Sequence, residues 1–255
     1  MREGHISKAF DGALAALHMR VLEMGGLVHE QVRQSSSAFT EWDAAAAELV
    51  VDRESEVAAY DRAFSQEHMT LIARRHPVAS DLRAVVGLSK VVAELERSDT
   101  EARKIARTVL QQQGGRPQRA TSVDVRHTAS LATSLFRNAL DALDSLDTGL
   151  AEQVMARDAD LEAEYAAGLR RLLTRAMEDP RHLQAVIESA FVLKSLEHIG
   201  DYARNIAQHV LAMAAEGEAR RQASSTEQNT AGEGNEPHSQ ASSPGEAVGL
   251  QPSQG

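Results

Sequence analysis

Two carboxylates one helical turn apart are the residues most able to do chemistry in this chain. Glu197 and Asp201 lie four positions apart in a segment with helical periodicity, and side chains at that spacing share one face of a helix. Their oxygens suit hard cations such as Mg²⁺, Ca²⁺, Mn²⁺ or iron. The spacing alone favours a plain solvated acidic face, because such pairs are common, and a metal site is the sharper hypothesis.

The apolar positions around this pair predict its orientation. They form one stripe along the helix expected at residues 181–215: Val192, Leu196, Ile199, Ala203, Ile206 and Val210. At about 100° per residue, this stripe is the core face of the helix. Glu197 and Asp201 point away from it. We therefore expect both carboxylates on the outer face, where a metal or a partner could reach them.

The segment that carries the pair occurs twice. Residues 94–106 match residues 195–207 at an offset of 101 positions, and 12 of 29 positions are identical between 82–110 and 183–211. The interval is longer than the typical solenoid repeat of ~20–50 residues. The duplication therefore indicates two copies of a small domain.

The first copy of the segment keeps only half of the carboxylate pair. Glu96 retains the first carboxylate, but Thr100 stands where the second copy has Asp201. Asp99 and Glu101 flank that position and point about 100° to either side of it. Neither replaces the missing carboxylate without a local adjustment, so a symmetric pair of metal sites is in doubt.

Other catalytic constellations are missing from the sequence. There is no cysteine, which excludes thiolate nucleophiles, disulfides and thiolate metal sites. The ten histidines form no His-x-x-x-His or Glu-x-x-His pair, and this disfavours a ferritin-like di-iron core. Phosphate-binding glycine loops and a Gly-x-Ser-x-Gly elbow are also missing. We expect a protein that is not an enzyme.

Periodicity and breaks divide the chain into six expected helices, three in each half. The prolines of His76-Pro77 and Asp179-Pro180 end two of them, because a residue before proline is pushed out of the α region. Short connections favour antiparallel neighbours. The expected helices span about residues 5–39, 41–75, 80–112, 122–146, 150–178 and 181–215.

We therefore expect an all-α fold of two tandem, similar, antiparallel three-helix bundles. The first bundle spans residues 1–113 and the second residues 122–216, with a linker at 114–121. Residues 217–255 are rich in Ser, Gln, Gly, Glu and Pro. Such a segment buries too little apolar surface to offset its ordering entropy, so we expect a disordered tail.

Composition narrows the class of protein further. The net charge of −10 argues against a nucleic-acid binder, which needs a positive surface for phosphate contacts. No apolar run approaches the ~20 residues of a membrane-spanning helix, and the N-terminus lacks the apolar core of a secretory signal. We expect a cytoplasmic protein with no direct membrane insertion and no nucleic-acid partner.

These features resemble the PhoU family, the regulatory proteins of bacterial phosphate uptake. Residues 197–207, EHIGDYARNIA, resemble the family signature ERIGDHAxNIA. Residues 72–83, IARRHPVASDLR, resemble its LARQQPVASDLR segment, and the spacing of His5, Phe10 and the following apolar residues fits its first helix. The resemblance covers about residues 3–215.

The resemblance implies a regulatory role without catalysis. Family members are typically dimeric, cytosolic negative regulators that couple the phosphate ABC transporter and its ATPase to a membrane sensor histidine kinase. Some bind iron or other metals through Glu/Asp-x-x-x-Asp motifs, which Glu197 and Asp201 match. By that resemblance Asn205 extends the motif, and Glu96 supplies half of a first copy.

The same resemblance makes Asp81, Arg83 and Arg204 candidate partner contacts. Asp81 has a second interpretation, in which its charge stabilises the helix N-terminus through the helix dipole while Leu82 packs into the core. Three hypotheses for the whole chain stay open. It is a regulatory adaptor of phosphate transport, a metal-dependent enzyme that uses its acidic face, or a helical scaffold whose acidic face is only solvated.

Overall fold

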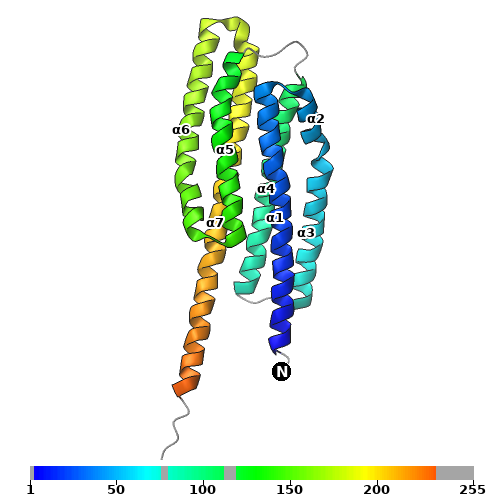
Figure 1. The fold of residues 1–255 in the computed structure, drawn as a ribbon, viewed down its shortest axis with the longest axis vertical. Helices are drawn as coiled ribbons and strands as arrows, with labels where there is room; N and C mark the ends of the chain where they lie inside the picture. The colour runs from blue at the N-terminus through cyan, green and yellow to red at the C-terminus, as the bar shows by residue number, and fades with distance from the viewer. Residues whose placement is uncertain (1–2, 76–79, 112–118, 234–255) are drawn as a thin grey trace, which may run out of the picture. The chain divides into compact units, whose positions relative to one another are not determined.

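The computed structural model is all-α, and it describes residues 3–75, 80–111 and 119–233 (Figure 1). The six expected helices are all present, the second of them interrupted once. The elements are α1 Glu3–Glu41, α2 Ala44–Asp52, α3 Glu54–Arg75, α4 Ser80–Gln111, α5 Arg119–Ser145, α6 Thr148–Glu178, the 3-10 turn η1 Pro180–His182, and α7 Leu183–Glu233.

Residues 1–217 form one compact unit in which the two halves share a seam. Helix α1 packs against α4 of its own half and against α5 of the other half. Helices α4 and α7, which carry the duplicated segment, also touch: an added Cβ at Gly87 would lie 2.7 Å from Met213 Cγ. The division into two separate bundles stays a prediction, while this close packing shows how the halves hold each other.

The buried residues confirm the periodicity of the expected helices. Along α1, Leu17, Val21, Met24 and Val28 are almost completely buried. The stripe predicted on α7, from Val192 to Val210, is buried in the same way. Burying such side chains stabilises the fold by about 1.5–3 kcal/mol each, as an upper estimate. These stripes fix which face of each helix remains for function.

The first helix of each half ends in the same kind of turn. Trp42 and Leu146 both adopt a positive φ, 62° and 51°, the left-handed conformation that often closes a helix C-terminus. The aspartate that follows each of them caps the next helix: Asp43 accepts from the Ala46 amide and Asp147 from the Leu150 amide. The duplication therefore extends to the turns.

Three expected boundaries are corrected by the structure. The second helix is not continuous, because it breaks at Arg53 between α2 and α3. Helix α5 begins at Arg119, so the expected linker ends earlier than position 121. Helix α7 continues through Glu233 instead of ending near 216; this stretch contains no proline and is rich in Ala, Glu, Arg and Gln, which favour helix. The rest of the predicted tail, 234–255, lies outside the described residues.

None of the helices in the described part of the chain is long and apolar enough to cross a membrane.

Candidate functional site

Glu197 and Asp201 lie on the side of α7 that faces outward beside α6. Their side chains are 18% and 41% exposed, so they are flanked by neighbours and not fully open to solvent. The close approach of α6 explains this: Gly200, between them, lies so near Leu161 that an added Cβ would overlap its Cδ2 atom. The predicted pair is together on one face, as expected, next to the close contact between α6 and α7.

Helix α6 brings a third carboxylate to the pair. Asp158 lies against α7 at Gly200, 3.7 Å from the position of an added Cβ. Burial raises the pKa of Asp158 despite the opposing effect of Arg204, and the nearby charges of Asp201 and Glu197 raise it further. Like charges crowd here, and a cation would relieve their repulsion.

Two cationic side chains of α7 lie against these carboxylates. Lys194 donates to Glu197 Oε2 at 2.6 Å, and the Arg204 guanidinium lies 3.3 Å from Asp158 and 3.5 Å from Asp201. Arg204, predicted as a partner contact, is therefore engaged within the fold, with 39% of its side chain exposed. The second-half cluster is Asp158, Glu197 and Asp201 with these two cations.

The first half has a related but different arrangement. Glu96 lies near Asp61 of α3, and its pKa is raised by burial and by the neighbouring Asp61 and Asp99 carboxylates. Thr100, in place of a second outward carboxylate, donates its hydroxyl to the Glu96 carbonyl at 3.0 Å. The outward face of α4 therefore keeps one carboxylate of the motif, as the sequence predicted.

An arginine at the matching repeat position is buried in the first half. Arg103 donates to Asp99 at 2.9 Å and pairs with Glu54, the first residue of α3, at 2.6 Å. Its side chain is 13% exposed and that of Asp99 is 3% exposed. Burial raises the pKa of Asp99, while Arg103 lowers it. Through Arg103, the exposed Glu54 at the start of α3 is tied to α4.

The seam between α4 and α7 takes up two further polar groups. Asn205 donates to Glu94 of α4 at 3.4 Å, and His198 Nδ1 lies 3.4 Å from Glu101 Oε1. Asn205 therefore faces the other half of the molecule, away from the carboxylates with which the family motif groups it. Of the four predicted metal ligands, only Glu197 and Asp201 are brought together.

As arranged, the carboxylates are already paired with cationic side chains of the protein itself. Within the described ranges, no group of three or more His, Asp or Glu side chains is placed to hold one ion. The reason is chemical, since Arg204 and Lys194 supply the positive charge that the carboxylates need. A metal would have to displace the guanidinium from Asp158 and Asp201.

The other predicted partner contacts lie in the first turn of α4. Asp81 is half-buried at the acidic start of the helix, where it complements the dipole, and Arg83 is exposed. Leu82 is 38% exposed, so it does not pack into the core as the second interpretation of Asp81 predicts. Its repeat equivalent on α7, Leu183, is exposed as well, so both copies present an apolar residue at this point.

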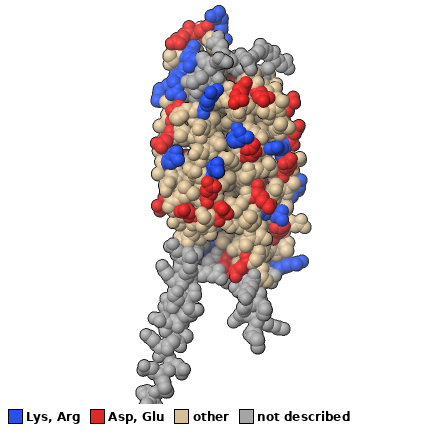
Figure 2. Space-filling model, viewed as in Figure 1, with Lys and Arg blue, Asp and Glu red and all other residues tan. Residues whose placement is uncertain are grey.

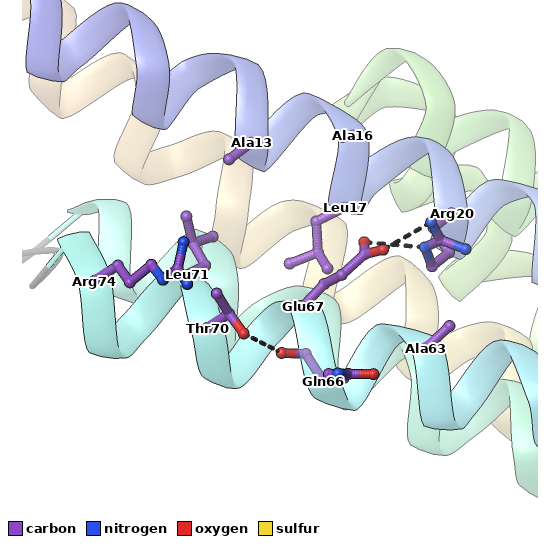
Figure 3. Close-up of a pocket in the computed structure, with 10 residues that line it drawn as sticks. All are labelled: Ala13, Ala16, Leu17, Arg20, Ala63, Gln66, Glu67, Thr70, Leu71 and Arg74. Atoms are coloured by element: carbon purple, nitrogen blue, oxygen red, sulfur yellow. Dashed lines mark hydrogen bonds and ion pairs between the residues drawn. The ribbon is translucent and has the colours of Figure 1, made fainter.

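Two clefts border the first half. One, of about 580 Å³, is polar and is lined by Glu96, Asp99, Arg103 and, from α7, Tyr202. The other, of about 650 Å³, lies between α1 and α3 over a floor of small apolar residues. Figure 3 shows Arg20 and Glu67 pointing toward each other across it, 2.8 Å apart. That ion pair closes one end of the cleft.

The sequence did not predict four residues of these clusters: Asp158, Lys194, Arg103 and Asp61. Asp158 and Asp61 lie on helices rich in charged residues, and their separation of 97 positions differs from the offset of 101 that defines the duplicated segment. The arginines did carry a signal, because Arg103 and Arg204 are identical at the repeat offset.

Comparison with known proteins confirms the resemblance found in the sequence. A family model described as "PhoU domain" matches residues 21–109 and 125–210, more than half of the chain. The phosphate-specific transport system accessory protein PhoU homolog of Pseudomonas putida is 39% identical over 209 residues, which are 81% of this chain and 81% of that protein. The PhoU accessory protein of Escherichia coli (strain K12) is 32% identical over 206 residues, 81% of this chain and 85% of that protein.

Solved structures agree with the sequence comparison. The crystal structure of PhoU from Pseudomonas aeruginosa matches with a TM-score of 0.77 at 38% identity and covers 81% of this chain and 99% of that one. The phosphate transport system regulatory protein PhoU from Streptococcus pneumoniae matches with a TM-score of 0.71 at 23% identity, which shows a shared fold.

Proposed function

The chain belongs to the PhoU family, and from that membership we propose that it is a negative regulator of phosphate uptake and phosphate-starvation signalling. The observation that supports the role most strongly is the match to accessory proteins of a phosphate transport system over most of the chain. An accessory protein acts on other proteins without turning over a substrate. The proposed role therefore needs contact surfaces and no catalytic centre.

We propose that the partners are the ATPase of the phosphate ABC transporter and its sensor histidine kinase. The proposal places the protein in the cytoplasm, where the ATPase works, as a homodimer. The two halves offer related surfaces for two such contacts, because the duplicated segment exposes apolar residues at matching positions. Leu82 and Val86 are exposed on α4, and Leu183 and Ile187 are exposed on α7.

The second of these surfaces is the more apolar. Phe191, one turn beyond Ile187, is 67% exposed, whereas the matching residue of the first half is Lys90. An exposed aromatic residue in an apolar stripe is typical of a contact surface, where aromatic side chains often carry the largest share of the binding energy. We propose that the α7 stripe, Leu183, Ile187 and Phe191, contacts one of the partners.

A deletion strain tests the role itself. Without the chain, a reporter driven by a phosphate-starvation promoter should be active in phosphate-rich medium, and expression of the chain should silence it. Unchanged low reporter activity in the deletion strain would contradict negative control.

Pull-down against the purified ATPase and kinase tests the contact. The variant Ile187→Ser/Phe191→Ser should lose capture of one partner, whereas Met19→Ser, which changes an apolar residue of α1 that is also largely exposed, should keep it. Equal capture by both variants would remove the α7 stripe from the proposal, and circular dichroism would show that both variants are folded.

Metal binding at the acidic face is the second candidate. The crowding of Asp158 by Asp201 and Glu197 favours it, but Arg204 and Lys194 oppose it. Elemental analysis of protein purified without chelators is the test. Stoichiometric metal that is lost in Glu197→Gln/Asp201→Asn would establish this candidate, and metal-free protein that still represses the reporter would set it aside.

A further inference from the structure

A groove lies along the seam between α1 and α5, apart from the sites described so far. It measures about 570 Å³ and is lined from both helices. Figure 2 shows basic side chains along the middle of the face on which α1 and α5 lie side by side, with acidic ones next to them. Its lining holds three arginines, a histidine and six hydroxyl groups: His29, Arg33, Ser36, Ser37, Thr40, Arg126, Ser130, Thr133, Ser134 and Arg137, with Ala129 and Glu41 completing it.

The arginines of this groove stand at both ends of a run of hydroxyls. On α5, Arg126 and Arg137 are eleven positions apart, which corresponds to about 16 Å along a helix. Ser130, Thr133 and Ser134 lie between them and line the groove. A ligand that meets both arginines must therefore be extended.

Arg33 and Arg137 face the groove from opposite helices at equivalent positions. The buried residues of the two helices match at an offset of 104, as in Val21 and Val125 or Phe39 and Leu143, and Arg137 follows Arg33 by 104 positions. Because the helices are antiparallel across the seam, with His18 Nε2 3.0 Å from the Leu143 carbonyl, the duplication supplies one arginine from each side.

The arginines of the groove differ in the ion pairs that they already make. Arg33 donates to both carboxylate oxygens of Glu30, at 2.8 and 2.6 Å, and Arg137 lies 4.0 Å from Asp141, but both arginine side chains are more than half exposed. Arg126 makes no ion pair with another residue in the described part of the chain, so a ligand meets three guanidinium groups and one groove carboxylate, Glu41.

The pKa of His29 reflects the positive charges that line the groove. Its ring stacks on Phe136, and Nε2 is buried without a hydrogen-bond partner among the described residues. Burial lowers the pKa of His29, the charge of Arg137 lowers it further, and Arg33 adds to this effect against Glu30. The cationic groups therefore converge on the same point. A bound anion would reverse their effect on this imidazole.

The hydroxyls divide into two groups. Ser36 and Thr40 donate to backbone carbonyls of α1, so they offer a ligand only oxygen lone pairs. Ser37, Ser130, Thr133 and Ser134 make no side-chain hydrogen bond to any described residue, and they can donate to a ligand. Guanidinium groups and hydroxyl donors along one groove are the groups that bind phosphate oxygens.

We propose that the α1–α5 groove binds a linear oligophosphate, whose successive phosphoryl groups run along the groove from Arg126 past Arg33 toward Arg137. Arg33 lies between the two α5 arginines, because His29, one turn before it, stacks on Phe136 across the antiparallel seam. The ligand class follows from charge and length, since a single phosphate reaches only part of this row of arginines, whereas a chain of phosphates follows it. The site joins the two halves of the molecule, and it stands independently of the regulatory role proposed above.

Calorimetric titration with tripolyphosphate at fixed ionic strength tests the proposal. Arg33→Gln/Arg137→Gln should weaken binding about tenfold or more, as expected for lost hydrogen bonds to a charged group. The matched control is Arg62→Gln/Arg157→Gln, which removes the same charge outside the groove and should change affinity less than about twofold.

Three further arms identify the ligand and the place. Orthophosphate and sulfate should bind at least about tenfold more weakly than tripolyphosphate, since each meets fewer arginines. Tripolyphosphate should raise the pKa of His29 in an NMR titration. No binding, equal loss in the control variant, equal affinity for orthophosphate, or an unmoved His29 would overturn the proposal. Tighter binding of ATP than of tripolyphosphate would overturn the ligand class in favour of a nucleotide.

Discussion

The two halves carry an arginine at the same repeat position, and each arginine ties two helices together. In the first half Arg103 is 13% exposed and pairs with Asp99 and Glu54. In the second half Arg204 is 39% exposed and pairs with Asp158 and Asp201. The Arg103–Asp99 pair is therefore largely buried, whereas the Arg204 pairs lie nearer to the surface.

A shift of one residue accounts for this difference. The second half has Gly200 followed by the outward Asp201, whereas the first half has Asp99 followed by Thr100. Moving the carboxylate back by one position rotates it by about 100° around the helix. The Asp99 carboxylate then points inward, and Arg103, which pairs with it, lies inward as well. Duplicated domains can therefore keep a charge pair and still assign it to the core in one copy and to the surface in the other.

The largest expected effect is on stability, from removing each arginine. Arg103→Met leaves the Asp99 carboxylate buried without its partner, which should lower the free energy of unfolding by about 3 kcal/mol. Arg204→Met, in a more exposed pair, should lower it by less than about 1 kcal/mol. Urea unfolding followed by circular dichroism measures both.

A double variant separates charge from packing in the first half. Asp99→Asn/Arg103→Met removes the orphaned charge as well and should recover a large part of the loss. Equal destabilisation by the two single arginine variants would show that the halves do not differ in the way described.

The next effect concerns the glycine that lets α6 approach α7. Gly200→Ala places a methyl group against the buried Leu161, and such overpacking should cost about 1–3 kcal/mol. Gly26→Ala is the control, because nothing lies within 4 Å of its added Cβ. It should stabilise the helix by about 0.5–1 kcal/mol. If Gly200→Ala left the stability in thermal unfolding unchanged, α6 and α7 would lie farther apart than the structure shows.

The matched turns should respond with opposite signs. Leu146 is exposed and holds a positive φ, so Leu146→Gly should stabilise the protein by about 0.5–1 kcal/mol. Trp42 shares that conformation but packs edge-on against Phe39, with ring centroids 5.5 Å apart. Trp42→Gly should therefore destabilise the protein. If thermal unfolding showed that both variants change the stability in the same direction, the two turns would not differ in this way.

The smallest effect is on the pH dependence of stability, through Asp158 at the contact between α6 and α7. Burial raises the pKa of Asp158 above 3.8, so its contribution to stability is largest below pH 3.8 and decreases as the pH rises through the raised value. Asp158→Asn removes that dependence. The stability of the variant relative to the parent should rise with pH from about 3.8 upward and then level off. A relative stability that falls over this range would assign Asp158 a lowered pKa instead.

Most of the fold could be predicted from the sequence, because apolar stripes and proline breaks are local signals. The break at Arg53 could not, since Asp52, Arg53 and Glu54 contain no residue that stops a helix. Tertiary contacts hold it: Glu54, at the start of α3, pairs with Arg103 on α4. The extension of α7 to Glu233 has a different cause: this stretch has few apolar residues to pack, but its residue types favour helix.

The candidate site was only half predictable. Glu197 and Asp201 were placed together by helical spacing alone, and the structure confirms that they share a face. Asp158 comes from another helix, so no local sequence pattern predicts that it lies beside Glu197 and Asp201. Asn205 was grouped with the carboxylates by family resemblance, yet its position on the helix turns it toward Glu94.

The most direct test compares the exposed apolar stripes of the two halves in the cell. In the deletion strain, Ile187→Ser/Phe191→Ser on α7 and the matched first-half variant Val86→Ser/Lys90→Ser on α4 are expressed at equal levels, and the phosphate-starvation reporter is measured in phosphate-rich medium. The α7 variant should lose repression, because the α7 stripe is the proposed partner contact, and the α4 variant should repress like the parent chain. Loss of repression in the α4 variant alone, or full repression by both, would contradict the assignment of the partner contact to α7.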